Sequence, residues 1–185
     1  MSAHVLGIDD APFDKTQATD VPIVGVVMAG AALVEGVTIT AFPIDGADAT
    51  SFIGDWIETM RWRPALHAVV IGGITIAGLG LVDITALASR LDRPVISVTR
   101  RMPSNVDLDA ALASAGLGDR RSILERTPPA HAVDDGLYVA CAGVDGPGAG
   151  AIVRTTLSKA SVPEPLRLAH MIGAAIVRGS SRGRA

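Results

Sequence analysis

Two adjacent carboxylates, Asp9 and Asp10, end a short apolar run that begins at His4 and reads HVLGIDD. A run of this length that does not end in a turn pair such as Asn-Gly is typical of a buried strand. Neighbouring side chains on a strand point to opposite faces, so only one of the two acids can share the face of Val5 and Gly7. A carboxylate on a central strand is costly to bury unless it is hydrogen-bonded or binds a cation. A metal site is therefore the first hypothesis, and capping of the following loop is the alternative.

Two further acids, Asp45 and Asp48, precede an apolar segment with helical spacing. Mg²⁺ takes oxygen ligands and keeps several waters, so Asp9 with Asp45 or Asp48 would meet its minimum. Asp45-Gly46 is also an ordinary turn pair, and Asp48 also suits the N-cap of a helix. Asp83, near another helix start, is expected to cap. The sequence leaves both interpretations open for Asp45 and Asp48.

The composition describes one compact domain over residues 1–185, with 49% apolar, 19% charged and 3% aromatic residues. A net charge of -3 gives no general attraction to nucleic acid, so a phosphate-binding surface would be a local patch. Cys141 is the one cysteine, which excludes an internal disulfide and a multi-cysteine zinc site. The first residues lack the pattern of a secretion signal, and no apolar stretch has the length of a membrane span. We expect a soluble, cytoplasmic protein with no membrane partner.

Hydrophobic periodicity predicts an α/β order of elements. Three strands joined by short turns predict an antiparallel meander, and later strands rich in Ala, Val and Ile are typical of parallel pairing. The predicted strands cover 4–10, 23–28, 33–44, 67–71, 94–99, 120–126 and 136–142; the predicted helices run from 48 to before Pro64, then over 82–91, 107–115, from 146 onward, and 163–177.

Several fragments, in order along almost the whole chain, resemble an archaeal endonuclease V-like family, formerly a domain of unknown function and now called endonuclease dU. The fragments are 5–10 with Pro12-Phe13, 44–50, 73–78 with Val82-Asp83, 94–98, 163–170 and 177–185. The resemblance implies a ribonuclease H-like mixed sheet, with three antiparallel strands, then parallel strands, and flanking helices. In that fold an acid on the first strand lies beside the end of the fourth strand, near the last helix.

The resemblance also implies a function: a metal-dependent endonuclease of DNA repair, using Mg²⁺ or Mn²⁺ on DNA that contains uracil or hypoxanthine. RNA stays open as a second substrate. The segment Gly7-Ile-Asp9 resembles the strand that carries the first catalytic aspartate of endonuclease V, which favours Asp9 over Asp10. The segment PEPLRLAH resembles that enzyme's last active-site segment and indicates His170. The candidate catalytic residues are Asp9, Asp45, Asp48 and His170, and the candidate metal ligands are Asp9, Asp45 and His170.

Two positions depart from the family pattern. The fourth strand usually ends in Asp-Gly, and its aspartate is a metal ligand, whereas this chain has Gly72-Gly73. The glutamate of endonuclease V would fall near Ser51-Phe52, where there is no acid. Loss of a ligand would weaken metal binding. The alternative is therefore a catalytically impaired nucleic-acid-binding or assembly protein that keeps the fold.

Arginines supply the candidate contacts to a DNA backbone. Arg167 lies three residues before His170, where it could contact a phosphate or pair with Glu164. The other candidates follow the fifth predicted strand or lie in the C-terminal segment: Arg100, Arg101, Arg178, Arg182 and Arg184. A homodimer is also possible, because the small-residue helices over 110–115 and 148–156 could pack on a second copy or on this domain's own sheet.

Overall fold

The computed structural model describes residues 3–134, 136–158 and 161–182. The main sheet within these ranges consists of β1 (His4–Asp10), β2 (Asp20–Ala29), β3 (Leu33–Pro43), β4 (Leu66–Ile71), β7 (Val95–Thr99), β8 (His131–Asp134) and β9 (Leu137–Ala142). A separate hairpin is formed by β5 (Thr75–Ile76) and β6 (Gly80–Leu81). The helices are α1 (Ala49–Thr59), α2 (Ile84–Leu91), α3 (Asn105–Ser114), α4 (Arg121–Arg126), α5 (Gly146–Thr155) and α6 (Glu164–Arg178).

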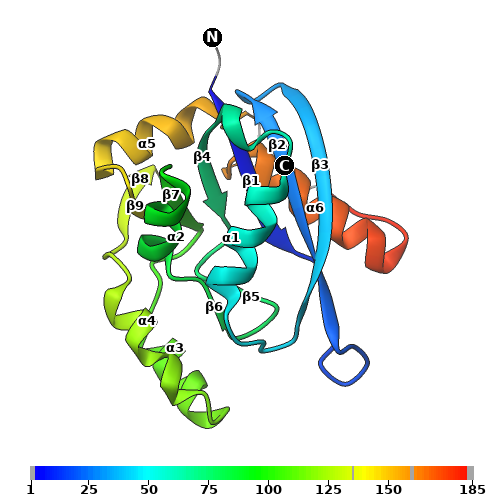
Figure 1. Cartoon of the computed structure of the whole chain (residues 1–185), viewed down its shortest axis with the longest axis vertical. Coiled ribbons are helices and arrows are strands. Elements are labelled where there is room, and N and C mark those ends of the chain that lie inside the picture. Colours follow the sequence, from blue (N-terminus) through cyan, green and yellow to red (C-terminus); the bar gives the residue numbers. More distant parts are fainter. Residues whose placement is uncertain (1–2, 135, 159–160, 183–185) are drawn as a thin grey trace.

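The strand order of the main sheet is β3-β2-β1-β4-β7-β9-β8 (Figure 1). β1, β2 and β3 form an antiparallel meander, and β4 and β7 continue the sheet parallel to β1. β9 then pairs antiparallel with β7, and β8 with β9. The predicted mixed sheet with flanking helices is therefore confirmed, with an antiparallel pair added at its far edge.

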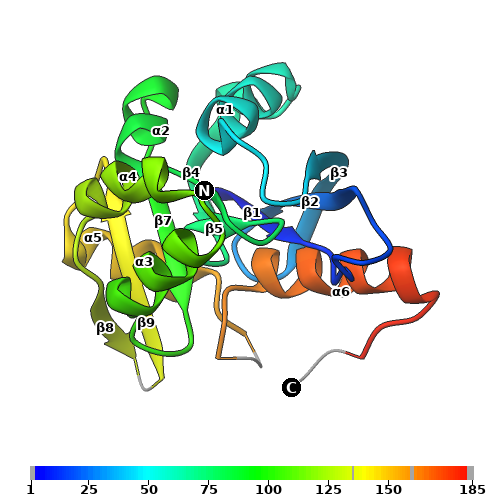
Figure 2. The same cartoon turned by 90° about the horizontal axis from the view of Figure 1, so that it is seen from below.

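Successive side chains of β1 point to opposite faces of the sheet, and each face is covered by other elements. Leu6 and Ile8 belong to the larger core, which includes the buried residues of α1 and α2, whereas Val5 belongs to a second core with α5 and α6. Figure 2 shows α1 and α2 on one side of the sheet and α6 on the other. At Gly7 the absence of a side chain lets α6 approach, because a Cβ there would lie 2.6 Å from the backbone nitrogen of Leu166. Asp9 lies on the α6 side and Asp10 on the other.

The predicted strand over 120–126 is wrong. This segment forms a 3-10 turn over Gly118–Arg120 followed by α4. Arg120 and Leu124, four residues apart, are its buried side chains, a spacing that places both on one face of a helix. β8 and the β5–β6 hairpin are too short to produce a periodic pattern, and the sequence did not predict them.

The described helices include none that is long and apolar enough to cross a membrane.

Candidate functional site

The carboxyl end of β1 meets α6 at Asp9 and His170. The Nδ1 atom of His170 lies 3.1 Å from Oδ2 of Asp9, although the residues are 161 positions apart. The Asp9 side chain is 20% exposed and the His170 side chain 65% exposed, so a ligand can reach the pair from solvent. The fold thus brings together the acid and the imidazole that the resemblance indicated.

The contact with Asp9 sets the protonation of His170. The hydrogen bond to Asp9 raises the pKa of His170 above its ordinary value of 6.5, and the charges of Asp9 and Asp10 act in the same direction. Partial burial and the charge of Arg178 lower it. A raised pKa favours the imidazolium, which donates from Nδ1 to Asp9 and leaves Nε2 available for a second partner.

Gly72 lies directly beside Asp9. Its backbone nitrogen donates to the carbonyl of Ile8 at 3.3 Å, just after the last residue of β4. A Cβ on Gly72 would lie 2.8 Å from Oδ1 of Asp9. A carboxylate at position 72 would therefore share its surroundings with Asp9, and this chain has no side chain there.

Asp10 points to the opposite face, as the alternation along β1 predicts. Its Oδ2 accepts a hydrogen bond of 2.8 Å from the backbone nitrogen of Ala77, in the turn of the β5–β6 hairpin. Burial and the neighbouring charge of Asp9 raise the pKa of Asp10, and the Ala77 bond opposes them. Ala77 has a positive φ of 48°, which is unusual for a residue with a side chain. Asp10 therefore anchors the hairpin.

Asp45 contacts the same hairpin. Its carboxylate accepts from Leu79 N at 2.8 Å and pairs with Lys15 at 2.7 Å. Its backbone nitrogen donates to Ala77 O at 2.9 Å. Burial would raise the pKa of Asp45, but the bonds from Lys15 and Leu79 outweigh it, and the pKa is lowered. These contacts place Asp45 with the hairpin on Asp10's side of the sheet.

Asp48 occupies the N-cap position of α1, but its side chain makes no capping hydrogen bond. Asp83 caps as predicted: its carboxylate accepts from the backbone nitrogens of Thr85 and Ala86 at 3.1 and 2.9 Å. It also pairs with Arg126 at 3.0 Å.

The candidate arginines have different surroundings. Arg167 pairs with Glu164 at 2.6 Å and contacts the sulfur of Met171 at 2.9 Å. The side chains at the other described positions are exposed: Arg100, Arg101, Arg178 and Arg182. Arg178 lies near enough to His170 to lower its pKa. Arg184 lies outside the described residues.

Among the described residues, no three His, Cys, Asp or Glu side chains converge closely enough to hold a metal ion. Asp9, Asp45 and His170 thus do not form a three-ligand set. Asp9 directs Oδ2 to His170 and Oδ1 toward Gly72. One carboxylate fits an ion that takes most of its ligands from water and phosphate oxygens, as Mg²⁺ does, and the His170 imidazole lies beside it as a proton donor.

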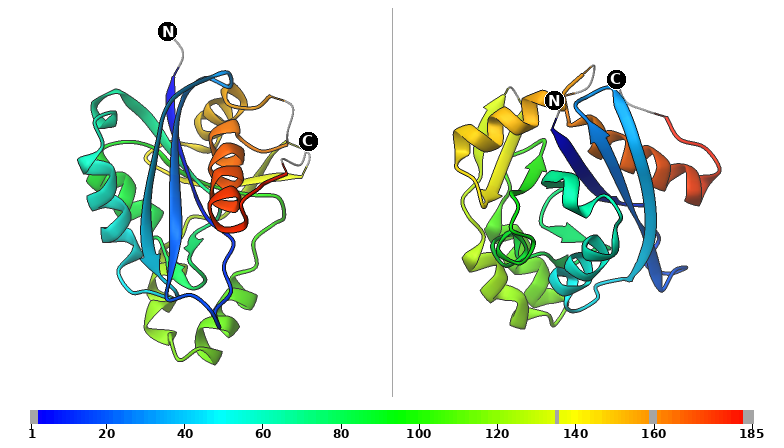
Figure 3. Two further views of the ribbon diagram at one scale, coloured as in Figure 1. Left: turned by 90° about the vertical axis from the view of Figure 1, so that its right-hand side faces the viewer. Right: turned by 45° about the horizontal axis from the view of Figure 1, so that its top comes forward.

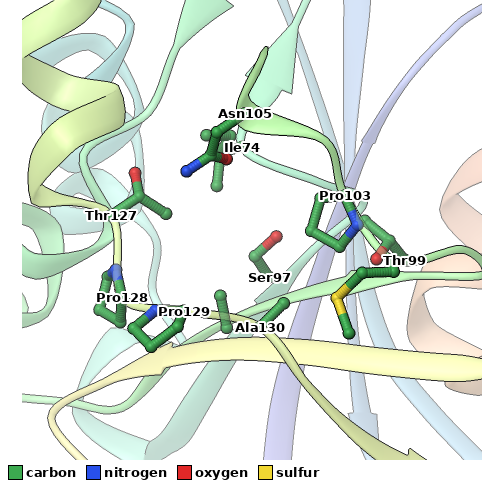
Figure 4. Close-up of a pocket in the computed structure, with 11 residues that line it drawn as sticks. Ile74, Ser97, Thr99, Pro103, Asn105, Thr127, Pro128, Pro129 and Ala130 are labelled. Carbon is green, nitrogen blue, oxygen red and sulfur yellow. The ribbon is translucent and has the colours of Figure 1, made fainter. Parts of the chain in front are cut away.

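A cavity of about 340 Å³, which the sequence did not indicate, lies at the carboxyl end of β7 (Figure 4). Its walls are mainly apolar, with polar groups from Ser97, Thr99, Asn105 and Thr127. Gly73 links the cavity to the Asp9 site: it follows Gly72, and a Cβ on it would lie 4.0 Å from Cγ2 of Thr99. The lining residues come from four segments that lie far apart in the sequence, which is why the sequence did not indicate the cavity. The paired prolines Pro128-Pro129 were the sequence feature that could have drawn attention to this place.

Comparisons with known proteins identify the family and the fold of the chain. The family model described as Endonuclease dU matches residues 1–177. A UPF0215 protein of Methanothermobacter thermautotrophicus is 37% identical over 98% of this chain and 91% of its own length. A UPF0215 protein of Methanopyrus kandleri is 34% identical over 96% of this chain and 93% of its own length.

Solved structures show the same fold. A protein of unknown function from Archaeoglobus fulgidus superposes with a TM-score of 0.88 at 32% identity, over 96% of this chain and 99% of that one. Endonuclease V of Bacillus subtilis gives a TM-score of 0.61 at 14% identity, over 95% and 81%. Endonuclease V of Ciona intestinalis, in complex with a 24mer DNA containing an inosine followed by a ribo-adenosine, gives 0.60 at 14%, over 91% and 82%. The chain therefore belongs to the endonuclease dU family and has the fold of endonuclease V.

Proposed function

We propose that this protein is a metal-dependent endonuclease that cuts DNA at deaminated bases, uracil or hypoxanthine, in DNA repair. The observation that carries the proposal is the 3.1 Å contact between Asp9 and His170 at the carboxyl end of β1. An acid and an imidazole that meet in a solvent-accessible position can bind a cation and exchange protons with a ligand. Family membership and the endonuclease V fold support a nuclease.

Asp9 is the residue that would hold a Mg²⁺ or Mn²⁺ ion, together with water and phosphate oxygens of the substrate, and His170 would act beside it as an outer ligand. When bound, such an ion neutralises charge on the phosphate and makes a water more acidic. We assign Asp45 to the hairpin, since Lys15 and Leu79 engage its carboxylate. Asp48, at the start of α1, has no described contact with either residue of the pair.

His170 moves a proton in this scheme. Asp9 holds the proton on Nδ1, and the imidazolium that this contact favours can give its Nε2 proton to the leaving oxygen. Hydrolysis forms one bond from the water oxygen to phosphorus and breaks one from phosphorus to the sugar oxygen, which leaves with a proton. Arg178 adds positive charge on the His170 side of α6.

The cavity provides a place for the base. Asp9 and the cavity lie at the same edge of the sheet but on opposite faces, because Ser97 pairs with Ile71 and Ala140 of the larger core whereas Asp9 faces α6. A base beside Ser97 would therefore reach a phosphate at Asp9 across this edge, where Gly72 and Gly73 carry no side chain. A deaminated base pairs poorly and costs less to remove from the helix, which favours its entry. Arg100 and Arg101 follow β7 at the cavity and are exposed, as backbone-binding residues must be.

A second candidate function is a nucleic-acid-binding or assembly protein that has lost catalysis. Gly72 favours it, because the position where a carboxylate would join Asp9 carries no side chain. RNA remains a possible ligand in either case.

The deciding experiment measures nicking of uracil- and hypoxanthine-containing oligonucleotides during titration with Mg²⁺ or Mn²⁺. Wild type is compared with Asp9→Asn, which keeps the side-chain shape and removes the charge. Asp92→Asn is the matched control: its side chain is 99% exposed and lies at the end of α2. An oligonucleotide of the same sequence without the lesion controls for non-specific cleavage.

Metal-dependent nicking by wild type and Asp92→Asn that Asp9→Asn loses supports the enzyme. Binding of the lesion oligonucleotide with no nicking in either metal rejects the enzyme and supports the second candidate.

A further inference from the structure

A hydroxyl group occupies an apolar position inside β7. Ser97 lies between two buried apolar residues of the strand, and it pairs with Ile71 of β4 and Ala140 of β9. Both partners belong to the larger core, so an apolar side chain would be expected at position 97 as well. Ser97 is 4% exposed, and no described residue forms a hydrogen bond with its hydroxyl. Such a group is costly in a protein interior, so its presence needs an explanation.

The Ser97 hydroxyl points into the cavity at the carboxyl end of β7, and the Asn105 amide lies across the cavity from it (Figure 4). Asn105 is the first residue of α3, and its amide likewise has no hydrogen-bond partner in the part of the chain that the structure describes. The hydroxyls of Thr99 and Thr127 already donate to backbone carbonyls, at 2.8 and 2.9 Å. Ser97 and Asn105 are therefore the lining residues whose side chains are available to a ligand.

The walls of the cavity are rigid and apolar. They include Pro103, Pro128 and Pro129, together with Ile74 and Ala130. Because a proline ring fixes its backbone torsion, these walls keep their shape without a ligand. The volume of about 340 Å³ lies within the range of about 300–1,000 Å³ of small-molecule sites, which combine apolar walls with a few polar groups. The cavity therefore suits a flat ring that carries hydrogen-bonding atoms on its edge.

The cavity lies at the same end of the sheet as Asp9. β7 supplies Ser97, and α3, which follows β7 after the exposed residues 100–104, supplies Asn105. Figures 1 and 3 show α3 and α4 side by side at the end of the molecule toward which β4 points. β1 is parallel to β4 and carries Asp9 at this end. A base in the cavity and a phosphate at Asp9 are thus approached from the same end.

We propose that Asn105 and Ser97 are the specificity-determining residues for the deaminated base, an inference that rests on the proposed function. Uracil and hypoxanthine share one edge, on which a carbonyl oxygen lies next to a ring N–H. A carboxamide is complementary to this edge, because its N–H donates to the carbonyl and its oxygen accepts from the ring N–H. The Ser97 hydroxyl then donates to a further acceptor atom of the base.

The helix and the cavity share the selection of the base. A carboxamide can turn around and fit the amino edge of cytosine or adenine as well, so Asn105 alone does not reject them. Those bases remain paired in the helix, whereas a deaminated base is mismatched with its former partner and leaves the helix at lower cost. Pairing therefore selects which base leaves, and Asn105 holds the edge of the base that does.

The first test is binding of oligonucleotides in EDTA, followed by fluorescence polarisation, so that it does not depend on cleavage. Asn105→Ala should weaken binding to a duplex with uracil opposite guanine by about tenfold, and binding to the undamaged duplex should stay the same. Gln17→Ala is the matched control, because Gln17 is the other side-chain amide of the chain and is exposed between β1 and β2. Ser97→Ala should weaken lesion binding by about threefold without lowering Tm, because its hydroxyl has no described partner to lose.

The second test changes the base instead of the protein. An oligonucleotide with 3-methyluracil lacks the ring N–H, so wild type should bind it about tenfold more weakly than the uracil oligonucleotide. Asn105→Ala should bind the two equally, because the acceptor for that N–H is already removed. Asn105→Asp accepts but does not donate, so it should prefer an unpaired cytosine to uracil.

Two results overturn the inference alone: wild type nicks and prefers the lesion but Asn105→Ala keeps that preference, or the losses from Asn105→Ala and from the 3-methyl group are additive. A lower Tm of Ser97→Ala with unchanged lesion binding overturns the role of Ser97. A wild type that neither nicks nor prefers the lesion overturns the proposed function together with this inference.

Discussion

An aspartate placed at position 72 tests whether the space beside Asp9 is a cation site. A Cβ on Gly72 lies 2.8 Å from Oδ1 of Asp9, so the new carboxylate would come within about 4 Å of the existing one. Gly72 does not have a positive φ, so the backbone accepts a side chain there. Without metal, the two carboxylates repel each other; with metal, they become a pair of ligands.

The repulsion is large enough to measure. Two unit charges at about 4 Å interact by about 4 kcal/mol at an effective dielectric constant of about 20. Because the Asp9 side chain is 20% exposed and one acid can take up a proton, we expect a loss of about 1–3 kcal/mol in unfolding free energy. For a chain of 185 residues each kcal/mol changes Tm by about 2–4 °C. Metal at about 100 times its Kd would raise the unfolding free energy again by about 2.7 kcal/mol.

The assay is thermal unfolding of wild type, Gly72→Asp and Gly72→Asn, in EDTA and with Mn²⁺. Gly72→Asn is the matched control, since it has the shape of aspartate without the charge. We expect Gly72→Asp to have the lowest Tm in EDTA and the largest rise with Mn²⁺. If Gly72→Asp and Gly72→Asn unfold together in EDTA, or Mn²⁺ raises both equally, the reasoning about this site is refuted.

Two further predictions concern the elements that build the site. Asp9→Asn should lower the pKa of His170 toward 6.5, followed by NMR without metal. The raised folded-state pKa means that the His170–Asp9 contact stabilises the fold below pH 6.5 and that this contribution is lost as pH rises through the folded value; an unchanged titration would contradict this. Gly7→Ala should lower the unfolding free energy, measured with urea, by about 1–3 kcal/mol, because its Cβ would lie 2.6 Å from the backbone nitrogen of Leu166. Gly118→Ala is the control and should change the unfolding free energy little, because no atom lies within 4 Å of its Cβ position. Equal losses in the two variants would refute the packing argument.

Much of the fold could be predicted from the sequence because long periodic segments report which side chains are buried. The alternation in HVLGIDD placed Asp9 and Asp10 on opposite faces, and the structure confirms it through His170 on one side and Ala77 on the other. The segment over 120–126 has no such repeat, and its helical form depends on the burial of Arg120 against Asp45 O and Leu79 O, far away in the chain.

The sequence by itself determined the kinds of chemical group available and the elements that carry them: an acid at the end of the first strand, a histidine on the last helix, and no acid at position 72. Only the tertiary structure decided which groups meet. It brought Asp9 to His170, directed Asp45 to Lys15, formed a cavity beside Gly73 and left β3 open. Local patterns report the burial of single elements, whereas contacts between distant residues depend on how the elements pack.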